Sequence, residues 1–473
     1  MTFYFYDLET SGVNPREQRI MQFAGQRTND KLEPIGDIDN VLIKLTEDVL
    51  PDPWAILTHK IPPQQTLAEG LTERDFLAWF QSDIATPDTV FVGYNNIRFD
   101  DEFIRYLHYR NFADAYEWHW KDNRSRWDLL DVGRMVRALR PDGIKWPYNS
   151  DGQPAAKLEM ITSVNKISHQ DAHTADADVK ATLGFAQLIF EHQPKMFNYL
   201  LEMRDKNKIA KLLSEDLPFV YTSGRYSSDH LKTTVVIPVG NHPAQPGTMI
   251  VYDLRFDPTE LRHLTTEEMA KRIFPPYGSD VPRLPAKALT LNKCPAVAPL
   301  TVLDKQSQER LAIDLDQVNN HLKLLRSHGI IDKILDAFAM QHKEKQTSFL
   351  SDSQLADAQL YEGFFNDADK QSMQQVRLAD ADAICELNPL FHDTRLESLL
   401  PLYRARNFPK SMSQSQQAEW HNYCKVKLTS GNPSRLDQWV RLIEQASQAN
   451  NTKQAQYLLE ELQLYVQSIL PVD

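Results

Sequence analysis

Two acidic residues end a run of aromatic residues at the start of the chain, in residues 3–9 (FYFYDLE). The aromatic run is too apolar for a surface loop and predicts a buried central strand. Because side chains two residues apart point to the same face of a strand, Asp7 and Glu9 leave the sheet together. Buried carboxylates side by side repel each other and lose hydration, and a divalent cation removes that cost. The same pair could also stand at an ordinary strand end without a metal ion, so other parts of the sequence are needed to choose between the two interpretations.

Bulk composition limits the class of protein. A length of 473 residues predicts two to four domains, and 42% hydrophobic with 25% charged residues is typical of a soluble globular protein. We expect no signal peptide and no membrane span. The net charge of −12 argues against general electrostatic binding of nucleic acid, so such binding needs a local basic patch. Three scattered cysteines form neither a zinc pattern nor a disulfide set, which fits a reducing cytoplasm.

Strand and helix patterns alternate over the first two hundred residues and predict a mixed sheet with helices on its faces, an α/β domain. No glycine-rich phosphate loop follows a strand, so a P-loop or dinucleotide fold is unsupported. Beyond Pro194 the pattern becomes β-rich, as in a small barrel or sandwich, and then helical to the end. Further strands are predicted over residues 20–28, 41–45 and 90–94, and helices over 67–80, 100–109, 128–139 and 175–192.

Two later stretches carry further candidate groups. Asp100 stands at the start of a predicted helix, where the helix dipole favours negative charge, although an ordinary cap would look the same. His173 and Asp178 are five residues apart, which is about 140° on an ideal helix. His173 can therefore approach Asp178 only from a loop before the helix, where a mobile general base would be placed. A surface or capping histidine is the alternative.

The ordered set Asp7, Glu9, Asp100, His173 and Asp178 resembles the DEDDh family of 3′→5′ exonucleases, whose pattern is Asp-x-Glu, then Asp, then His-x4-Asp. The sister subgroup has tyrosine where this chain has Thr174, so the histidine version applies. The chain also resembles the bacterial exodeoxyribonuclease I family nearly from end to end. The stretches that carry this resemblance are residues 125–131 (SRWDLLD), 292–295 (NKCP), 360–365 (LYEGFF) and 403–409 (YRARNFP).

The resemblance implies an RNase H-like exonuclease domain over residues 1–192, an SH3-like domain over 194–349 and a helical C-terminal domain over 351–473. It implies 3′→5′ degradation of single-stranded DNA to 5′-mononucleotides, in DNA repair and recombination. Small exoribonucleases use the same five residues, but they end near residue 190 of this numbering, so the added domains favour DNA. An inactive scaffold for DNA ends would be expected to lose a metal ligand, and none is lost.

For the chemistry, the resemblance implies two Mg²⁺ ions, for which Mn²⁺ could substitute. Asp7 would bridge both ions, Glu9 and Asp178 would complete one site, and Asp100 would help to hold the other. Carboxylate oxygens suit Mg²⁺, which keeps water molecules for use as the nucleophile. His173 would accept the proton of the attacking water.

Residues 105–145 carry nine Lys or Arg against six Asp or Glu, with aromatic residues among them. Such a segment suits unpaired DNA, because aromatic rings stack on bases and cations hold phosphates. Trp118 and Trp127 are expected in the core instead. The family usually has arginine at the position of Lys157. The resemblance implies substrate contacts from Glu9, Arg105, Tyr116, Trp120, Arg134 and Lys157, and Arg225, Lys232, Arg404 and Arg406 are further candidates, the last two equally suited to interdomain ion pairs.

One partner is implied besides single-stranded DNA. Exonucleases of this kind are recruited by the acidic, apolar C-terminal tail of single-stranded DNA-binding protein, which needs a basic rim beside an apolar pocket. Arg140 matches the family's position for that rim. Nothing in the sequence requires more than a monomer.

Overall fold

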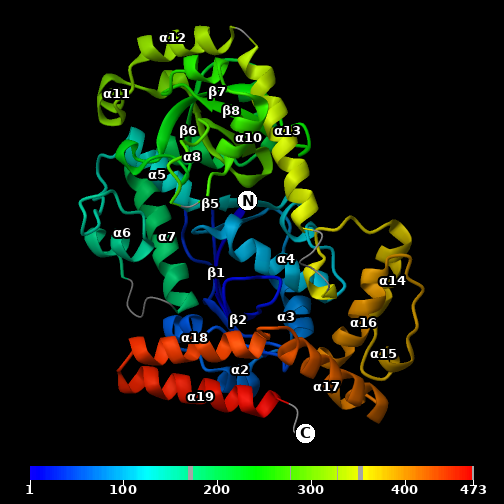
Figure 1. Cartoon of the computed structure of the whole chain (residues 1–473). Coiled ribbons are helices and arrows are strands. Elements are labelled where there is room, and N and C mark those ends of the chain that lie inside the picture. The colour runs from blue at the N-terminus through cyan, green and yellow to red at the C-terminus, as the bar shows by residue number, and fades with distance from the viewer. Residues whose placement is uncertain (169–173, 277, 328, 350–354, 471–473) are drawn as a thin grey trace. The chain divides into compact units, whose positions relative to one another are not determined.

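The computed structural model describes residues 1–168, 174–276, 278–327, 329–349 and 355–470, with side chains of 344–349 excepted (Figure 1). Contacts divide the chain into two compact units that do not follow chain order. Unit one comprises Met1–Ser125, Gln170–Lys180 and Ser353–Asp473, and unit two comprises Arg126–His169 and Ala181–Asp352.

Unit one is built on a mixed sheet in which four strands have the order β3-β2-β1-β4. β1 pairs antiparallel with β2 and parallel with β4, and β2 pairs antiparallel with β3, so the predicted mixed sheet and its opening meander are confirmed. One core cluster packs the aromatic residues of β1 and its neighbours against helix residues, including Trp118 as expected. The strands are β1 (Thr2–Thr10), β2 (Ile20–Thr28), β3 (Asp39–Leu42) and β4 (Thr89–Gly93), and β5 (Ser125–Asp128) lies at the unit boundary.

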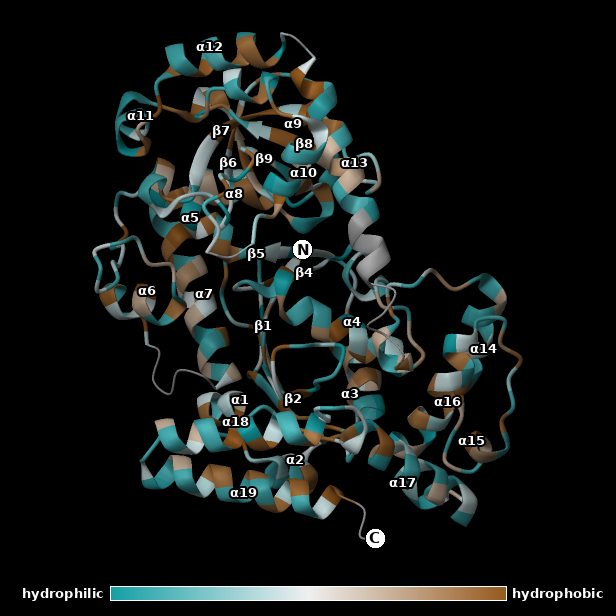
Figure 2. Ribbon diagram, viewed as in Figure 1, coloured by the Kyte–Doolittle hydropathy of each residue, from teal (hydrophilic) through white to brown (hydrophobic). Residues whose placement is uncertain are grey.

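The helices of unit one come from both ends of the chain. α18 and α19 contact α1, and α19 also contacts α2 (Figure 2). In Figure 2 both C-terminal helices carry hydrophobic residues among hydrophilic ones, as expected for half-buried helices. The helices are α1 (Pro53–His59), α2 (Pro63–Glu69), α3 (Glu73–Trp79), α4 (Asp100–Arg110), α14 (Asp367–Leu378), α15 (Ala383–Glu386), α16 (Thr394–Asn407), α17 (Gln414–Thr429), α18 (Arg435–Ala449) and α19 (Lys453–Ile469).

The prediction of a single helix over residues 67–80 is wrong, because two helices, α2 and α3, share this stretch. Gly70 ends α2, and the backbone of Leu71 pairs with the chain beside β3, accepting from the Lys44 N–H at 2.7 Å. Thr72 then caps α3 by accepting from the Asp75 N–H. The break leaves Leu67 and Leu71 each 38% exposed, although an unbroken helix with this spacing of apolar residues would bury both.

Unit two carries the β-rich region, an antiparallel sheet of order β10-β6-β7-β8-β9 with helices around it. Its strands are β6 (Phe219–Thr222), β7 (Thr233–Asn241), β8 (Thr248–Asp253), β9 (Ala286–Thr290) and β10 (Ala296–Pro299). Its helices are α5 (Leu129–Leu139), α6 (Leu158–Asn165), α8 (Pro194–Glu202), α9 (Lys206–Ser214), α10 (Thr266–Ile273), α11 (Lys305–Leu311), α12 (Leu315–Leu325) and α13 (Ile330–Phe349). α7 (Ala175–His192) begins in unit one. No helix of the described ranges combines the length and the apolar character that crossing a membrane requires.

A buried ion cluster joins the N-terminal and C-terminal parts of unit one. Arg406 lies 2.7 Å from Asp48 and 2.6 Å from Asp357, and Lys427 lies 2.6 Å from Asp48. Arg19, in the loop between β1 and β2, reaches Asp357 at 3.1 Å. All five side chains are at most 4% exposed. Of the two roles that the sequence left open for Arg406, a DNA contact or an ion pair, the structure shows the ion pair.

Both acids of this cluster stay ionised in spite of their burial. Burial by itself raises the pKa of Asp48, but Arg406, Lys427 and Arg19 together hold that pKa well below its ordinary value. The same three cations lower the pKa of Asp357. Removing one acid would leave buried cations without enough negative charge, which is the costly way to break a buried ion pair.

We expect Asp48→Asn to lower the free energy of unfolding by about 3 kcal/mol near neutral pH, the usual cost of an uncompensated buried charge. A carboxyl with a lowered folded-state pKa stabilises above its unfolded pKa and loses that contribution as pH falls toward the folded pKa. The loss of stability below about pH 4 should therefore be smaller in Asp48→Asn. Urea unfolding at several pH values measures both effects.

The control for that experiment is Glu117→Gln, which removes an exposed ion pair with Lys121 in the same unit. Its unfolding midpoint should stay close to that of the unmodified chain, because exposed pairs contribute little. Equal midpoints for the two variants would contradict a stabilising role for the cluster.

Candidate active site

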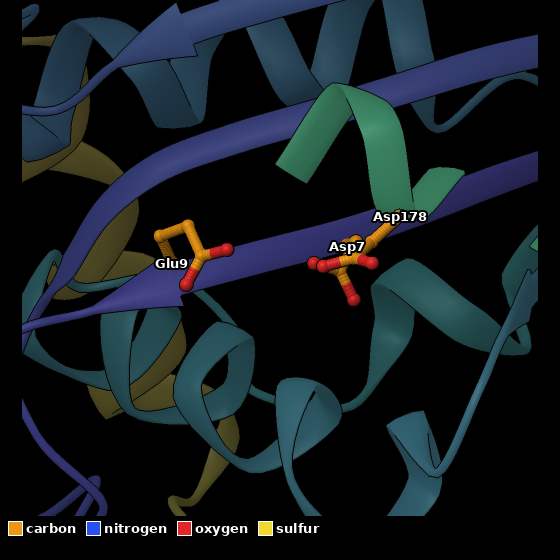
Figure 3. A group of neighbouring side chains, drawn as sticks. All are labelled: Asp7, Glu9 and Asp178. Atoms are coloured by element: carbon orange, nitrogen blue, oxygen red, sulfur yellow. The ribbon is translucent and has the colours of Figure 1, made fainter. Parts of the chain in front are cut away.

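Three carboxylates converge at the end of β1. Asp7 and Glu9 leave the same face of that strand, as the sequence predicts, and Asp178 reaches them from the first turns of α7 (Figure 3). Each of the three can offer one oxygen such that these oxygens all lie within 4.8 Å of one another. Side chains more than 160 positions apart in the sequence thus meet in one cluster.

The start of α7 is tied to the sheet by a side chain that sequence reasoning missed. Gln22 stands opposite Glu9 in the β1–β2 pairing. Its side-chain oxygen accepts a hydrogen bond of 3.3 Å from the backbone N–H of Ala175, the first residue of α7. A residue on the neighbouring strand therefore sets the position from which Asp178 projects.

Asp100 enters from a second helix. It is the first residue of α4 and only 4% exposed. The next residue, Asp101, is fully buried and accepts a hydrogen bond from the hydroxyl of Tyr6 on β1. Asn96 also donates to the Tyr6 hydroxyl, at 3.2 Å. Tyr6 therefore connects β1 to the start of α4. In the sequence, the adjacent acids at 100–101 are the one feature that hints at this link.

Burial and like charge act in the same direction on this cluster. Burial, followed by Asp100 and Asp178, raises the pKa of Asp7 well above its ordinary value. Burial, followed by Asp7 and Asp178, raises the pKa of Glu9 to about 9. Buried acids whose charges repel each other disfavour folding, but they become favourable ligands when a cation replaces their protons.

The donor set fits a hard divalent cation. The cluster offers carboxylate oxygens, the ligands that Mg²⁺ and Mn²⁺ prefer. Opposite oxygens around an ion with bonds of about 2.1 Å stand about 4.2 Å apart, close to the observed spread. Among the described residues of the cluster there is no histidine or cysteine ligand. His173, the predicted general base, lies outside the described residues, so its role stays a prediction.

The predicted substrate contacts of unit one lie around α4 and the segment after it. Trp120 is 57% exposed, as a stacking side chain requires. Arg105 is mostly buried, 2.5 Å from Glu102, with its guanidinium 5.5 Å from the ring of Tyr116. Phe364 is 88% exposed and its ring lies 5.9 Å from that of Tyr116. Sequence reasoning noted the stretch around Phe364 but missed its exposure, because only tertiary packing separates exposed aromatic residues from buried ones.

The remaining candidates lie in unit two. Lys157 is exposed, 3.8 Å from Glu159, and Arg134 pairs with Asp131 at 2.7 Å. Arg140 lies 3.2 Å from Asp304 and donates to the backbone oxygen of Val302. Trp127 is 1% exposed, so its predicted place in the core is confirmed.

Three family models match the chain in sequence order. They are Exonuclease over residues 4–185, Exonuclease I SH3-like domain over 204–340 and Exonuclease I C-terminal domain over 354–469. Exodeoxyribonuclease I of Haemophilus influenzae is 39% identical over 90% of both chains, and that of Escherichia coli is 37% identical over 99% of this chain and 98% of the relative. The chain belongs to the exodeoxyribonuclease I family. The expected resemblance is thereby confirmed, and the protein is a nuclease.

Solved structures of exonuclease I share the fold, among them those of the E. coli enzyme. The complex of that enzyme with a dA16 oligonucleotide superposes with a TM-score of 0.93 at 36% identity, covering 99% of both chains. A zinc-bound complex of it with single-stranded DNA gives 0.92 at 35% identity, and a structure of SSB and exonuclease I with the inhibitor CFAM gives 0.88 at 36%, each over 99% of both chains. The predicted succession of exonuclease, SH3-like and helical C-terminal folds is confirmed.

We expect cation binding at the carboxylate cluster to displace protons. Because the pKa of Glu9 is about 9 and that of Asp7 is also raised, the metal-free cluster holds protons at neutral pH. The affinity for Mn²⁺ should therefore rise with pH between about 6.5 and 8.5, by up to tenfold per pH unit for each proton displaced. Calorimetry in buffers of different ionisation enthalpy counts the protons.

Asp7→Asn serves as the comparison, because it removes one ligand and one repelling charge together. It should bind Mn²⁺ weakly and release fewer protons. An affinity of the unmodified chain that is independent of pH across that range would contradict the assignment of this cluster as a cation site.

Proposed function

We propose that this protein degrades single-stranded DNA from its 3′ end to 5′-mononucleotides, in DNA repair and recombination. The observation that carries the proposal is the convergence of Asp7, Glu9 and Asp178 at the end of a buried strand. The relatives support the choice of substrate, since the E. coli enzyme has been solved with DNA oligonucleotides. The free thiols of the described structure are compatible with a cytoplasmic enzyme, and we propose that it acts as a monomer.

We propose two Mg²⁺ ions, exchangeable for Mn²⁺, as the resident cofactors. Asp7 would contact both ions, Glu9 and Asp178 would complete one site, and Asp100 would contribute to the other. Bound ions of this kind activate a water nucleophile and neutralise charge that develops on the phosphoryl group. The pKa values of Asp7 and Glu9 support this assignment, because the cluster is costly without positive charge.

The chain's own residues supply proton transfer and orientation. His173, by its place five residues before Asp178, would take the proton of the attacking water. Tyr6 and Gln22 hold α4 and α7 against the strands, so that acids from three elements keep a fixed spacing. A fixed array of charges stabilises the transition state without having to reorganise during the reaction.

We propose that the strand is held by cations and aromatic rings. In unit one the contacts would be Glu9, Arg105, Tyr116 and Trp120. The ion pair of Arg105 with Glu102 orients its guanidinium beside the Tyr116 ring, and Trp120 is free of the core. In unit two they would be Arg134 and Lys157. A lysine at position 157 would hold a phosphate as a point charge, without the bidentate geometry of arginine.

The three sequence segments would divide this work. We propose residues 1–192 as the catalytic domain, 194–349 as the SH3-like domain and 351–473 as the helical domain, the last two adding DNA contacts. An exoribonuclease is the alternative, since the same five residues could cleave RNA. The matches to family models specific for exonuclease I, beyond residue 204, favour DNA.

A labelled deoxyoligonucleotide and its ribo counterpart, each with Mg²⁺, test the proposal. The DNA should be shortened from its 3′ end to mononucleotides, and the RNA should be cut far more slowly. Asp7→Asn should abolish cleavage, because the residue would contact both ions, yet should still bind the strand. Equal rates on both strands would indicate the exoribonuclease, and near-normal turnover of Asp7→Asn would exclude this site.

We also propose that the acidic C-terminal tail of single-stranded DNA-binding protein docks at Arg140. The guanidinium is partly exposed and already pairs with Asp304, so it can exchange one carboxylate for another. Arg140→Ala should weaken binding of a labelled tail peptide by several-fold at low salt, without slowing cleavage of naked DNA. Fluorescence anisotropy measures the affinity.

Lys271→Ala is the charge-matched control, since Lys271 is exposed on α10 of the same unit. Its affinity for the tail should equal that of the unmodified chain. If Arg140→Ala and Lys271→Ala lower the affinity for the tail peptide equally, the effect comes from general electrostatics and Arg140 is not part of a specific site.

A further inference from the structure

Unit two contains a cavity that none of the residues proposed for cleavage lines, although Arg225, a candidate DNA contact from the sequence, forms part of its wall. Its volume is about 320 Å³, within the size range of small-molecule sites. The loop at residues 225–230, strands β7 to β9 and helices α10 and α13 contribute to its walls. Every lining residue belongs to unit two, so the cavity is complete within that unit.

Aromatic and aliphatic side chains form much of the wall. Ile273 and Phe338 are buried, whereas Phe274 is 41% exposed. Tyr226 completes this set from the loop. Rings with an accessible face suit a flat ligand, because stacking rewards a planar partner over a branched aliphatic one.

Two polar groups face this apolar surface. Asp253 is 5% exposed, and its Oδ1 accepts from the Thr234 hydroxyl at 2.6 Å and from the Arg255 backbone N–H at 3.1 Å. The Tyr226 hydroxyl is buried and, among the described residues, has no hydrogen-bond partner. Burial raises the pKa of Asp253 and of Tyr226, and the nearby carboxyl raises the latter further. A buried hydroxyl such as that of Tyr226 requires a hydrogen-bond partner, which a ligand can supply.

Positive charge dominates the rest of the lining. Four cations, Arg225, Arg255, Arg283 and Lys287, accompany the single acid Asp253. The guanidinium of Arg225 lies 5.5 Å from the Phe274 ring, and the ammonium of Lys287 lies 4.6 Å from the Tyr226 ring. The ligand should therefore carry negative charge next to a flat ring.

These features exclude simpler occupants. An apolar molecule would leave the Tyr226 hydroxyl without a hydrogen-bond partner, and an inorganic anion would leave the rings uncovered. A cation would meet four like charges. We propose that this cavity binds a nucleotide, with the base against the aromatic wall, its N–H edge at Asp253 and Tyr226, and its phosphate at the cations.

The polar pair also selects among bases. Guanine presents N1–H and N2–H₂ as adjacent donors for a carboxylate, and its O6 can accept from a hydroxyl. Adenine offers one amino donor beside the acceptor N1, which a carboxylate repels. Guanine nucleotides should therefore bind more tightly than adenine nucleotides. This site is independent of the proposed cleavage reaction, because it needs neither the carboxylate cluster nor a metal ion.

Calorimetry on the full chain in EDTA, which removes metal ions from the carboxylate cluster, tests the site with dGMP and dAMP. We expect saturable binding of dGMP and at least fivefold weaker binding of dAMP. Tyr226→Phe, which keeps the ring and deletes one hydroxyl, should lower the affinity for dGMP about fivefold. Phe274→Ala, which removes part of the aromatic wall, should lower the affinity for both nucleotides at least fivefold.

Tyr148→Phe is the matched control, since Tyr148 is an exposed tyrosine of unit two outside the cavity. Absence of dGMP binding, equal affinity for dAMP, or an equal loss in Tyr226→Phe and Tyr148→Phe would overturn the proposal. Cleavage of DNA by Tyr226→Phe, measured separately with Mg²⁺, should be retained, so failure here is distinguishable from failure of the nuclease assignment.

The nucleotide could be the free product or part of a bound strand. A second titration adds dGMP to a complex of the chain with a labelled, guanine-containing single strand in EDTA. Release of the strand from the unmodified chain but not from Tyr226→Phe identifies the strand as the source. Simultaneous binding of both identifies the free mononucleotide.

Discussion

Repulsion among carboxylates at the end of β1 is the constraint on which the candidate active site of this protein depends. Asp7, Glu9 and Asp178 approach within 4.8 Å where aromatic strands exclude water, and besides burial the charge of Asp178 raises the pKa of both Asp7 and Glu9. Such an arrangement persists only because the surrounding structure enforces it. Hydrogen bonds from Tyr6 to α4 and from α7 to Gln22 supply that enforcement.

The same unit buries other acids in the opposite way. Asp48 and Asp357 share Arg19, Arg406 and Lys427, and their pKa values fall instead of rising. The protein's own cations neutralise these acids, so this cluster needs no ligand. It also links the helical C-terminal segment to β1, because the side chain of Arg19 pairs with Asp357 and its backbone oxygen accepts a hydrogen bond from the Ser11 N–H just beyond Glu9. Opposite pKa shifts thus distinguish a cluster that binds from one that holds the fold together.

Local sequence rules succeeded where one element decides the outcome. The aromatic run of β1, the spacing of Asp7 and Glu9 and the helix start at Asp100 follow from periods of a strand and a helix, and all are present. The rules failed where a distant segment intervenes. The helix expected over residues 67–80 is interrupted because the Leu71 backbone pairs next to β3. The sequence left open whether Arg406 contacts DNA or makes an ion pair, because its acidic partners lie more than 350 and 45 positions away.

The sequence by itself determined the family, the order of the exonuclease, SH3-like and helical folds, and the identity of the acids. These depend on residue types at short spacings, which the chain displays directly. Tertiary structure decided which acidic residues are buried together with no cation among the described residues to neutralise them. It also decided that Phe364 is exposed while Arg105 is largely buried, and that a cavity lined by cations and aromatic rings exists in unit two. Burial and long-range pairing create these properties, and both arise only when segments far apart in the chain come into contact.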